Sequence, residues 1–134
     1  MADVIRVSTR RRNELVEITR QVQEVVSGAG MEDGAVLVYV PHSTAGVCIN
    51  ENADPDVRAD VSKFLGGLIP QHSGFVHVEG NSDSHIKAIL TGPSVMVIVE
   101  GGRLLLGRWQ GIYLAEFDGP RQREVWVKML GYRG

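Results

Sequence analysis

The last third of the sequence contains strand patterns and no helical pattern, and this feature constrains the fold most. Residues 95–99 form a short apolar run, residues 104–117 predict one long or bulged strand, and residues 124–129 alternate apolar and polar side chains. A doubly wound parallel sheet would need a helix between successive strands. The sequence therefore predicts an α+β fold with a large mixed or antiparallel β-sheet.

Three short helices are expected earlier in the chain. Thr19, the Asp54-Pro55-Asp56 segment, and Ser82 or Asp83 are suited to begin them, because these residue types favour helix starts. Apolar residues recur at helical spacing in each, which predicts one buried stripe per helix. The expected buried residues are Val22, Val25 and Val26, then Val57, Val61, Phe64, Leu65 and Leu68, then Ile86, Ile89 and Leu90.

Strands are also predicted over residues 4–8, 14–18, 35–40 and, briefly, 75–78. The run over residues 35–40 is continuously apolar, so we expect a central strand buried on both faces. Arg10, Arg11 and Arg12 fall between the first two strands. Because acidic residues flank this short basic run, a solvated turn is expected there.

The composition is that of an ordinary globular domain. Of the 134 residues, 43% are hydrophobic and 22% charged, which suits a single domain over residues 1–134. The net charge of −2 provides no basic field, so neither nucleic acid nor an anionic membrane is expected as a partner. One cysteine, Cys48, cannot form an intramolecular disulfide. Without a secretory signal or a long apolar run, a cytoplasmic protein is expected.

All four histidines lie between His42 and His85. His42 follows a predicted strand, His77 lies in an apolar-alternating stretch, and His85 falls in the first turn of a helix, so these three can converge on one divalent metal. The alternative is that each is an isolated, hydrogen-bonded histidine. Spacing alone favours this alternative, because no compact motif such as HExxH is present. His72 is expected to be exposed.

Several polar residues around the histidines are candidates for substrate contacts. Glu51 has no evident capping role and is a candidate general base, whereas Asp54 and Asp83 are better explained as helix caps. The helix start over residues 80–83 is suited to an anion, and Arg103 follows two glycines in a turn suited to phosphate. Gln110 and Gly111 interrupt an apolar stretch, which indicates a bulge or the close approach of a ligand or neighbouring subunit.

Four sequence blocks, in this order, resemble the YjbQ family, which is also described as secondary thiamine-phosphate synthase enzymes. They are VYVPHSTAGV (38–47), NENADPDV (50–57), EGNSDSHIKA (79–88) and GRLLLGRWQGIY (102–113). The resemblance extends from the first strands to residues 116–121. At Arg108 the sequence departs from the family, which usually has threonine there. A bulky cation beside Trp109 alters the expected pocket.

The resemblance implies a compact α+β fold with a large sheet, assembled as a homotrimer. It also implies that His42, His77 and His85 hold a divalent metal. Zinc is the metal expected from the imidazole ligands, and Mg²⁺ is a further expected cofactor, bound with pyrophosphate. The activity attributed to the family joins a pyrimidine pyrophosphate to a thiazole phosphate, giving thiamine phosphate.

Three functions stay open from the sequence. The first is this transferase. The second is a metal-dependent hydrolase of a small phosphorylated or cyclic substrate, and the third is a non-catalytic trimeric module that binds a metabolite. For the transferase, the expected catalytic residues are Glu51, Arg103 and Glu116. The expected substrate-binding residues are Gly80, Asn81, Ser82, Asp83 and Gln110.

Overall fold

The computed structural model describes residues 2–71 and 80–131. Its strands are β1 (Asp3–Ser8), β2 (Glu14–Glu17), β3 (Asp33–Tyr39), β4 (Ala45–Glu51), β5 (Ser94–Glu100), β6 (Arg103–Leu104), β7 (Gln110–Glu116) and β8 (Gln122–Leu130). Its helices are α1 (Thr19–Ala29), α2 (Pro55–Leu68) and α3 (Ser82–Thr91). The α+β class and the three predicted helices are confirmed.

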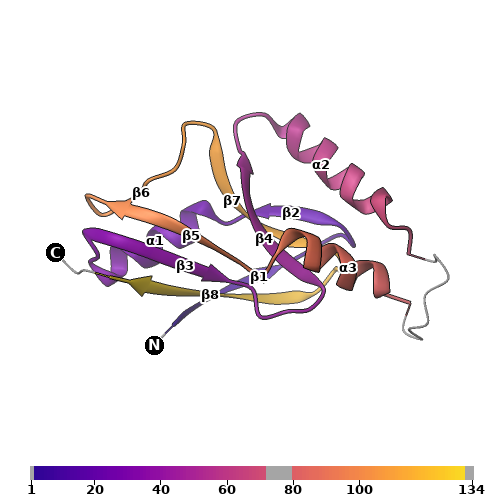
Figure 1. The fold of residues 1–134 in the computed structure, drawn as a ribbon, viewed down its shortest axis with the longest axis horizontal. Helices are drawn as coiled ribbons and strands as arrows, with labels where there is room; N and C mark the ends of the chain where they lie inside the picture. Colours follow the sequence, from indigo (N-terminus) through magenta and orange to yellow (C-terminus); the bar gives the residue numbers. More distant parts are fainter. Residues whose placement is uncertain (1, 72–79, 132–134) are drawn as a thin grey trace.

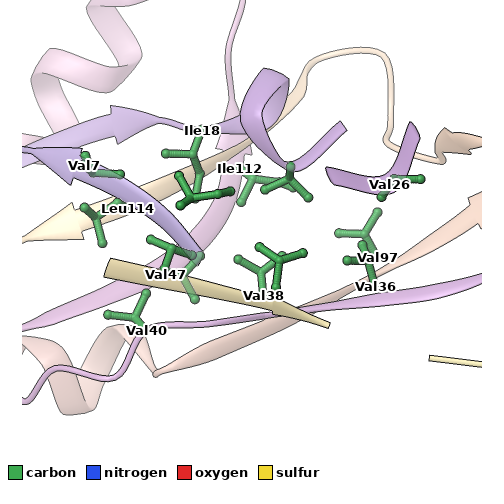
Figure 2. Close-up of a cluster of buried hydrophobic side chains, with 14 of the residues drawn as sticks. Val7, Ile18, Val26, Val36, Val38, Val40, Val47, Val97, Ile112 and Leu114 are labelled. Carbon is green, nitrogen blue, oxygen red and sulfur yellow. The ribbon is translucent and has the colours of Figure 1, made fainter. Parts of the chain in front are cut away.

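The described strands are divided between two antiparallel sheets (Figure 1). Sheet A has the order β1-β8-β3-β5-β6, and sheet B has the order β2-β7-β4. Valine, isoleucine and leucine side chains from the inner faces of both sheets form the main core. Figure 2 shows Val36 and Val38 of β3, Val97 of β5 and Ile112 of β7 within this cluster. Alternation along each strand decides which side chains face it.

Strand β3 is central, as predicted, but only one of its faces is covered in the single chain. Val36 and Val38 are fully buried, whereas Tyr39 is 40% exposed on the outer face. The strand that is buried on both faces is β7. Its Ile112 and Leu114 face sheet A, and its Tyr113 contributes to a second cluster on the other side of sheet B.

Helix α1 completes the main core. Val22 and Val26 are fully buried, and Gly30 ends the helix in the left-handed conformation at φ 68°. The prediction that Thr19 caps this helix is wrong. Ile18 occupies the cap position, while the Thr19 hydroxyl donates to Glu17 and accepts the backbone N–H of Ile112. The hydroxyl thus links the helix to β7.

Helices α2 and α3 pack against the outer face of sheet B, but not as their apolar stripes predict. No residue of α2 is buried, and Phe64 and Leu68 are 66% and 46% exposed. In α3, Ile89 and Leu90 are 79% and 63% exposed. The buried side chains of α3 are mainly polar or charged, because the surface against which it packs supplies complementary charges. They are Asp83, Ser84, Lys87 and Ala88.

The structure differs from the sequence prediction at two strands. Strand β4 has no counterpart in the prediction, because glycine, cysteine and asparagine weaken the alternation of apolar and polar side chains along it. The single strand predicted over residues 104–117 is two strands in different sheets. Gln110 closes the intervening turn, since its N–H donates to the Gly107 carbonyl and its side-chain oxygen accepts the Gly107 N–H. The predicted strand over residues 75–78 lies outside the described residues. Within the described ranges, no helix has the length and apolar character to span a membrane.

Candidate functional site

A cluster of polar and charged side chains, most of them buried, joins the β1–β2 turn, the start of α3 and the β7–β8 turn. We call it the polar cluster. Its members are Thr9, Arg12, Asn81, Asp83, Ser84, Lys87, Glu116, Asp118, Arg121 and Arg123. Buried ionic groups are rare unless they are paired, so this concentration marks a specialised region of the fold.

Glu116 is a fully buried member of the polar cluster. Its carboxylate is fully buried and accepts hydrogen bonds from the Thr9 hydroxyl (2.7 Å), from Nε and Nη2 of Arg123, and from the backbone N–H groups of Phe117 and Asp118 (3.0 Å each). Burial alone would raise the pKa of Glu116, but the hydrogen bonds outweigh it and the pKa is lowered. Both oxygens are occupied, which suits a positioning role better than that of a general base.

Arg12 links two carboxylates of the polar cluster. Its Nη1 donates to Asp118 at 2.9 Å, and its Nη2 donates to Asp83 at 3.0 Å. Lys87, almost fully buried, donates to the other oxygen of Asp83 at 3.0 Å. Arg12 is therefore an organising residue, and the predicted solvated turn is wrong at this position. Sequence reasoning missed it because its partners lie about 70 and about 100 positions away.

The start of α3 belongs to the same cluster. Asn81, not Ser82 or Asp83, occupies the cap position, and it makes no side-chain cap. Its Nδ2 donates to Asp118 at 2.9 Å, while its buried Oδ1 has no hydrogen-bond partner. Burial would raise the pKa of Asp118, but hydrogen bonds from Asn81 and Arg121 lower it. Gly80, with φ 77°, precedes this turn and is suited to that left-handed conformation.

His42 lies next to the polar cluster, on the loop after β3. Its Nε2 accepts the backbone N–H of Glu124 at 3.0 Å. Burial lowers the pKa of His42, and the positive charge of Arg123 lowers it further, so the neutral ring is favoured. In a neutral ring whose Nε2 accepts, Nδ1 carries the proton. Neither nitrogen then presents a free lone pair, so His42 in this arrangement does not fit a metal.

The rest of the predicted metal site is only partly described. His77 lies outside the described residues. His85 is in the first turn of α3, where its N–H donates to the Asn81 carbonyl at 3.4 Å. Among residues 2–71 and 80–131, no group of three or more histidine, cysteine, aspartate or glutamate side chains is arranged to hold a metal. The three-histidine site therefore stays a prediction.

Glu51 and Gln110 face each other in the β4–β7 ladder. The sequence predicts no capping role for Glu51. In the structure, however, one of its carboxylate oxygens accepts the Ala53 N–H at 3.0 Å and shapes the turn before α2. The prediction for Asp54 is confirmed, because its side chain accepts the Asp56 N–H at the start of α2.

Gly111 is needed for packing within this chain. A Cβ added there would lie 2.6 Å from Oε2 of Glu17 and 2.8 Å from Cβ of Asn52. The close approach inferred from its sequence context is therefore made by this chain's own side chains. Arg103 lies nearby, on the rim of a depression of about 600 Å³ that Glu17 and Thr19 also line.

The predicted site residues consequently fall into two groups. Glu51 pairs with Gln110 at one end of the β4–β7 ladder, and Ala45 pairs with Glu116 at the other. Six residues of extended strand separate the two ends by about 20 Å. His42 and residues 80–83 lie with Glu116, whereas Arg103 lies away from them, at the depression lined by Glu17 and Thr19. In Figure 1, β6 and the start of α3 lie far apart along the longest axis.

These features define a two-sheet α+β domain with polar side chains gathered at both ends of its smaller sheet. The family model described as UPF0047 protein YjbQ-like matches residues 3–132, and the chain belongs to this family. The UPF0047 protein MJ1081 of Methanocaldococcus jannaschii is 52% identical over 93% of this chain and 91% of its own length. YugU of Bacillus subtilis is 47% identical over 98% of this chain and 100% of its own length.

Solved structures show the same fold. A YjbQ/UPF0047 family protein of Clostridium acetobutylicum has a TM-score of 0.93 at 47% identity and covers 96% of this chain and 99% of its own. A hypothetical protein of Aeropyrum pernix has a TM-score of 0.93 at 37% identity, with 98% and 99% covered. The resemblance drawn from the four sequence blocks is confirmed at the level of the family and the fold.

Proposed function

We propose that this chain is a small-metabolite enzyme that joins a pyrimidine pyrophosphate to a thiazole phosphate. The observation that carries the proposal is where the four family blocks lie. Each contributes a side chain to one of the two polar groups: His42 and Asn81 to one, Glu51 and Gln110 to the other. The four blocks thus supply side chains to both polar groups, in addition to core residues such as Val38 and Ile112.

The reaction needs anion binding and little covalent chemistry from the protein. The thiazole nitrogen forms a bond to the activated methylene carbon, and the carbon–oxygen bond to pyrophosphate breaks with its electron pair leaving on pyrophosphate. Fixed cations and backbone amides stabilise such a leaving group. We assign this role to Arg103 and to the amides of residues 80–83, with Ser82 and Asp83 at the helix start. Glu51 contacts the pyrimidine amine, and Gln110 helps to hold the ring.

Glu116 has a different role from the one expected. Because its oxygens are taken by Thr9, Arg123 and two backbone amides, we assign it to positioning: it fixes the β7–β8 turn and, through Arg123, the strand beside His42. No step of the reaction passes through its proton.

We propose that the functional unit is a homotrimer. The outer face of sheet A presents Val4, Tyr39, Met96, Ile98 and Trp126, each at least 40% exposed. A contiguous apolar face of this kind marks a protein interface. The two polar groups lie too far apart in one chain to share a small substrate, so a complete site requires one group from each of two neighbouring subunits.

The metal also stays a proposal. Zinc on His42, His77 and His85 requires the His42 ring to release the Glu124 amide. A bound divalent ion would neutralise pyrophosphate charge, and Mg²⁺ accompanying the substrate supplies the same chemistry. Protein purified without chelator should contain about one zinc per chain, and His77→Ala should lose it. Wild-type protein free of metal, and unable to bind added zinc, would rule this site out.

The reaction itself is tested by incubating the protein with both substrates and measuring thiamine phosphate. Glu51→Gln should reduce the rate while leaving the fold intact. Glu24→Gln, on an exposed part of α1, is the matched control and should retain the wild-type rate. Absence of product from the assembled, metal-loaded protein would overturn the transferase. Release of inorganic phosphate from a phosphate ester instead would favour the hydrolase.

A further inference from the structure

A cleft of about 670 Å³ lies between the β1–β2 turn and one face of α2. We call it the α2 cleft. From α2 it is lined by residues at helical spacing, which are Pro55, Arg58, Ala59, Ser62, Lys63 and Gly66. Most of these side chains are small or polar. This face of the helix therefore does not close against β2, and the space stays open.

The lining of the α2 cleft is strongly basic, although the whole chain is slightly acidic. Arg11, Arg58 and Lys63 line it, against one carboxylate, Glu14. One oxygen of Glu14 already accepts the backbone N–H groups of Arg10 and Arg11. In the part of the chain that the structure describes, neither Arg11 nor Lys63 forms an ion pair.

Arg58 is held in place and lacks a partner for one buried donor. Its guanidinium lies 5.3 Å from the centre of the Tyr113 ring, a cation–π contact that limits its orientation. Its Nε is buried and has no hydrogen-bond partner. A buried N–H without an acceptor is costly in free energy. Among the described residues Arg58 pairs with no carboxylate, so its guanidinium charge is open to an anion in the cleft.

The floor of the cleft is fixed by a buried cation. Lys87 donates to the Asn13 side chain (3.3 Å) and to the Gly66 carbonyl (3.1 Å), and both of these residues line the cleft. Lys87 thereby ties the β1–β2 turn and α2 to α3. A cleft with a fixed floor is preformed, which reduces the ordering cost of binding.

We propose that the α2 cleft binds the phosphate or pyrophosphate group of a small molecule, with Arg58, Lys63 and Arg11 as the contacting cations. The volume falls within the range of about 300–1,000 Å³ that is usual for small-molecule sites. Guanidinium groups bind phosphate oxygens through paired hydrogen bonds. The site is separate from the one assigned to Arg103 and does not depend on the transferase reaction.

The test is calorimetric titration of the full chain with inorganic pyrophosphate and, in a second arm, with a phosphate monoester. Arg58→Gln should weaken pyrophosphate binding at least about tenfold, the value of one charge-assisted hydrogen bond. Lys63→Glu, at an exposed position, should weaken it without affecting the fold. Arg6→Gln is the matched control: it removes one positive charge from an exposed β1 position outside both proposed phosphate sites and should leave affinity unchanged.

Two results would overturn the proposal: no pyrophosphate binding to the wild-type chain, or equal affinity in wild type, Arg58→Gln and Lys63→Glu. Thermal melting checks that each variant is folded. If Arg58→Gln does not fold, Lys63→Glu still decides the test. If the chain binds pyrophosphate in an Arg58-dependent way but forms no thiamine phosphate, the transferase is rejected and the α2 cleft proposal is supported. Stronger binding of the monoester than of pyrophosphate would identify the ligand as a phosphate ester.

Discussion

Arg123 on β8 donates from both Nε and Nη2 to the carboxylate of Glu116 at the end of β7, and both side chains are buried. β7 belongs to sheet B and β8 to sheet A, so this ion pair joins the two sheets at the turn between them. Thr44 on the β3–β4 loop accepts from the same guanidinium at 2.9 Å. One buried pair thus fixes the end of the molecule that carries His42.

Replacing one partner of this pair should be strongly destabilising. Glu116→Gln leaves the buried Arg123 without its counter-charge, which costs about 3–5 kcal/mol of unfolding free energy. Urea unfolding at fixed protein concentration measures it. Glu24→Gln, which breaks an exposed pair, should change stability by less than about 1 kcal/mol. Equal effects of the two variants would show that the buried pair has no special role.

Acid should destabilise the protein by protonating the carboxylates of Glu116 and Asp118. The pKa values of Glu116 and Asp118 are lowered in the folded state, so the unfolded chain binds protons more readily. Their contribution to stability is present above the unfolded pKa values of about 4 and is lost as pH falls through the lower folded values. The stability difference between wild type and Glu116→Gln should therefore shrink below about pH 4. A difference that stays constant down to pH 2 would contradict this.

Gly111 should not tolerate a side chain. Gly111→Ala places a methyl group against Glu17 and Asn52 on a central strand, and the overpacking should cost about 1–3 kcal/mol. Gly67→Ala is the matched control in α2, where nothing lies within 4 Å of the added Cβ. Because alanine favours helix, this control should gain about 0.5–1 kcal/mol. Thermal or urea unfolding should show a lower unfolding free energy for Gly111→Ala and a higher one for Gly67→Ala.

Assembly should depend on the outer face of sheet A. Ile98→Glu introduces a charge into that apolar face and should convert the trimer into monomers, as measured by light scattering at micromolar concentration. Phe64→Glu, at an apolar residue on α2 that is 66% exposed against 55% for Ile98, should remain trimeric. A wild-type chain that is monomeric, or trimers formed by Ile98→Glu, would reject this interface.

The sequence by itself determined the fold class, the three helices and the family. Local signals suffice for the fold class and the helices: strand alternation, the Asp54-Pro55 helix start and the glycines that end helices act over a few residues. The family follows from the resemblance of the four sequence blocks. The split of residues 104–117 between two sheets was not determined locally. It depends on a turn that Gln110 closes and on pairing partners far along the chain.

The site depended still more on tertiary structure. Arg12, Asp83 and Asp118 are ordinary charged residues in the sequence, and only the fold brings them together in one buried cluster. Ile89 and Leu90 fit a buried stripe, yet α3 buries Lys87, because its ammonium finds three acceptors there. Apolar periodicity predicts burial when hydrophobic transfer dominates, and it fails where long-range charge pairing outweighs that transfer. Such pairing leaves no local pattern, so only the tertiary structure decided which polar residues meet.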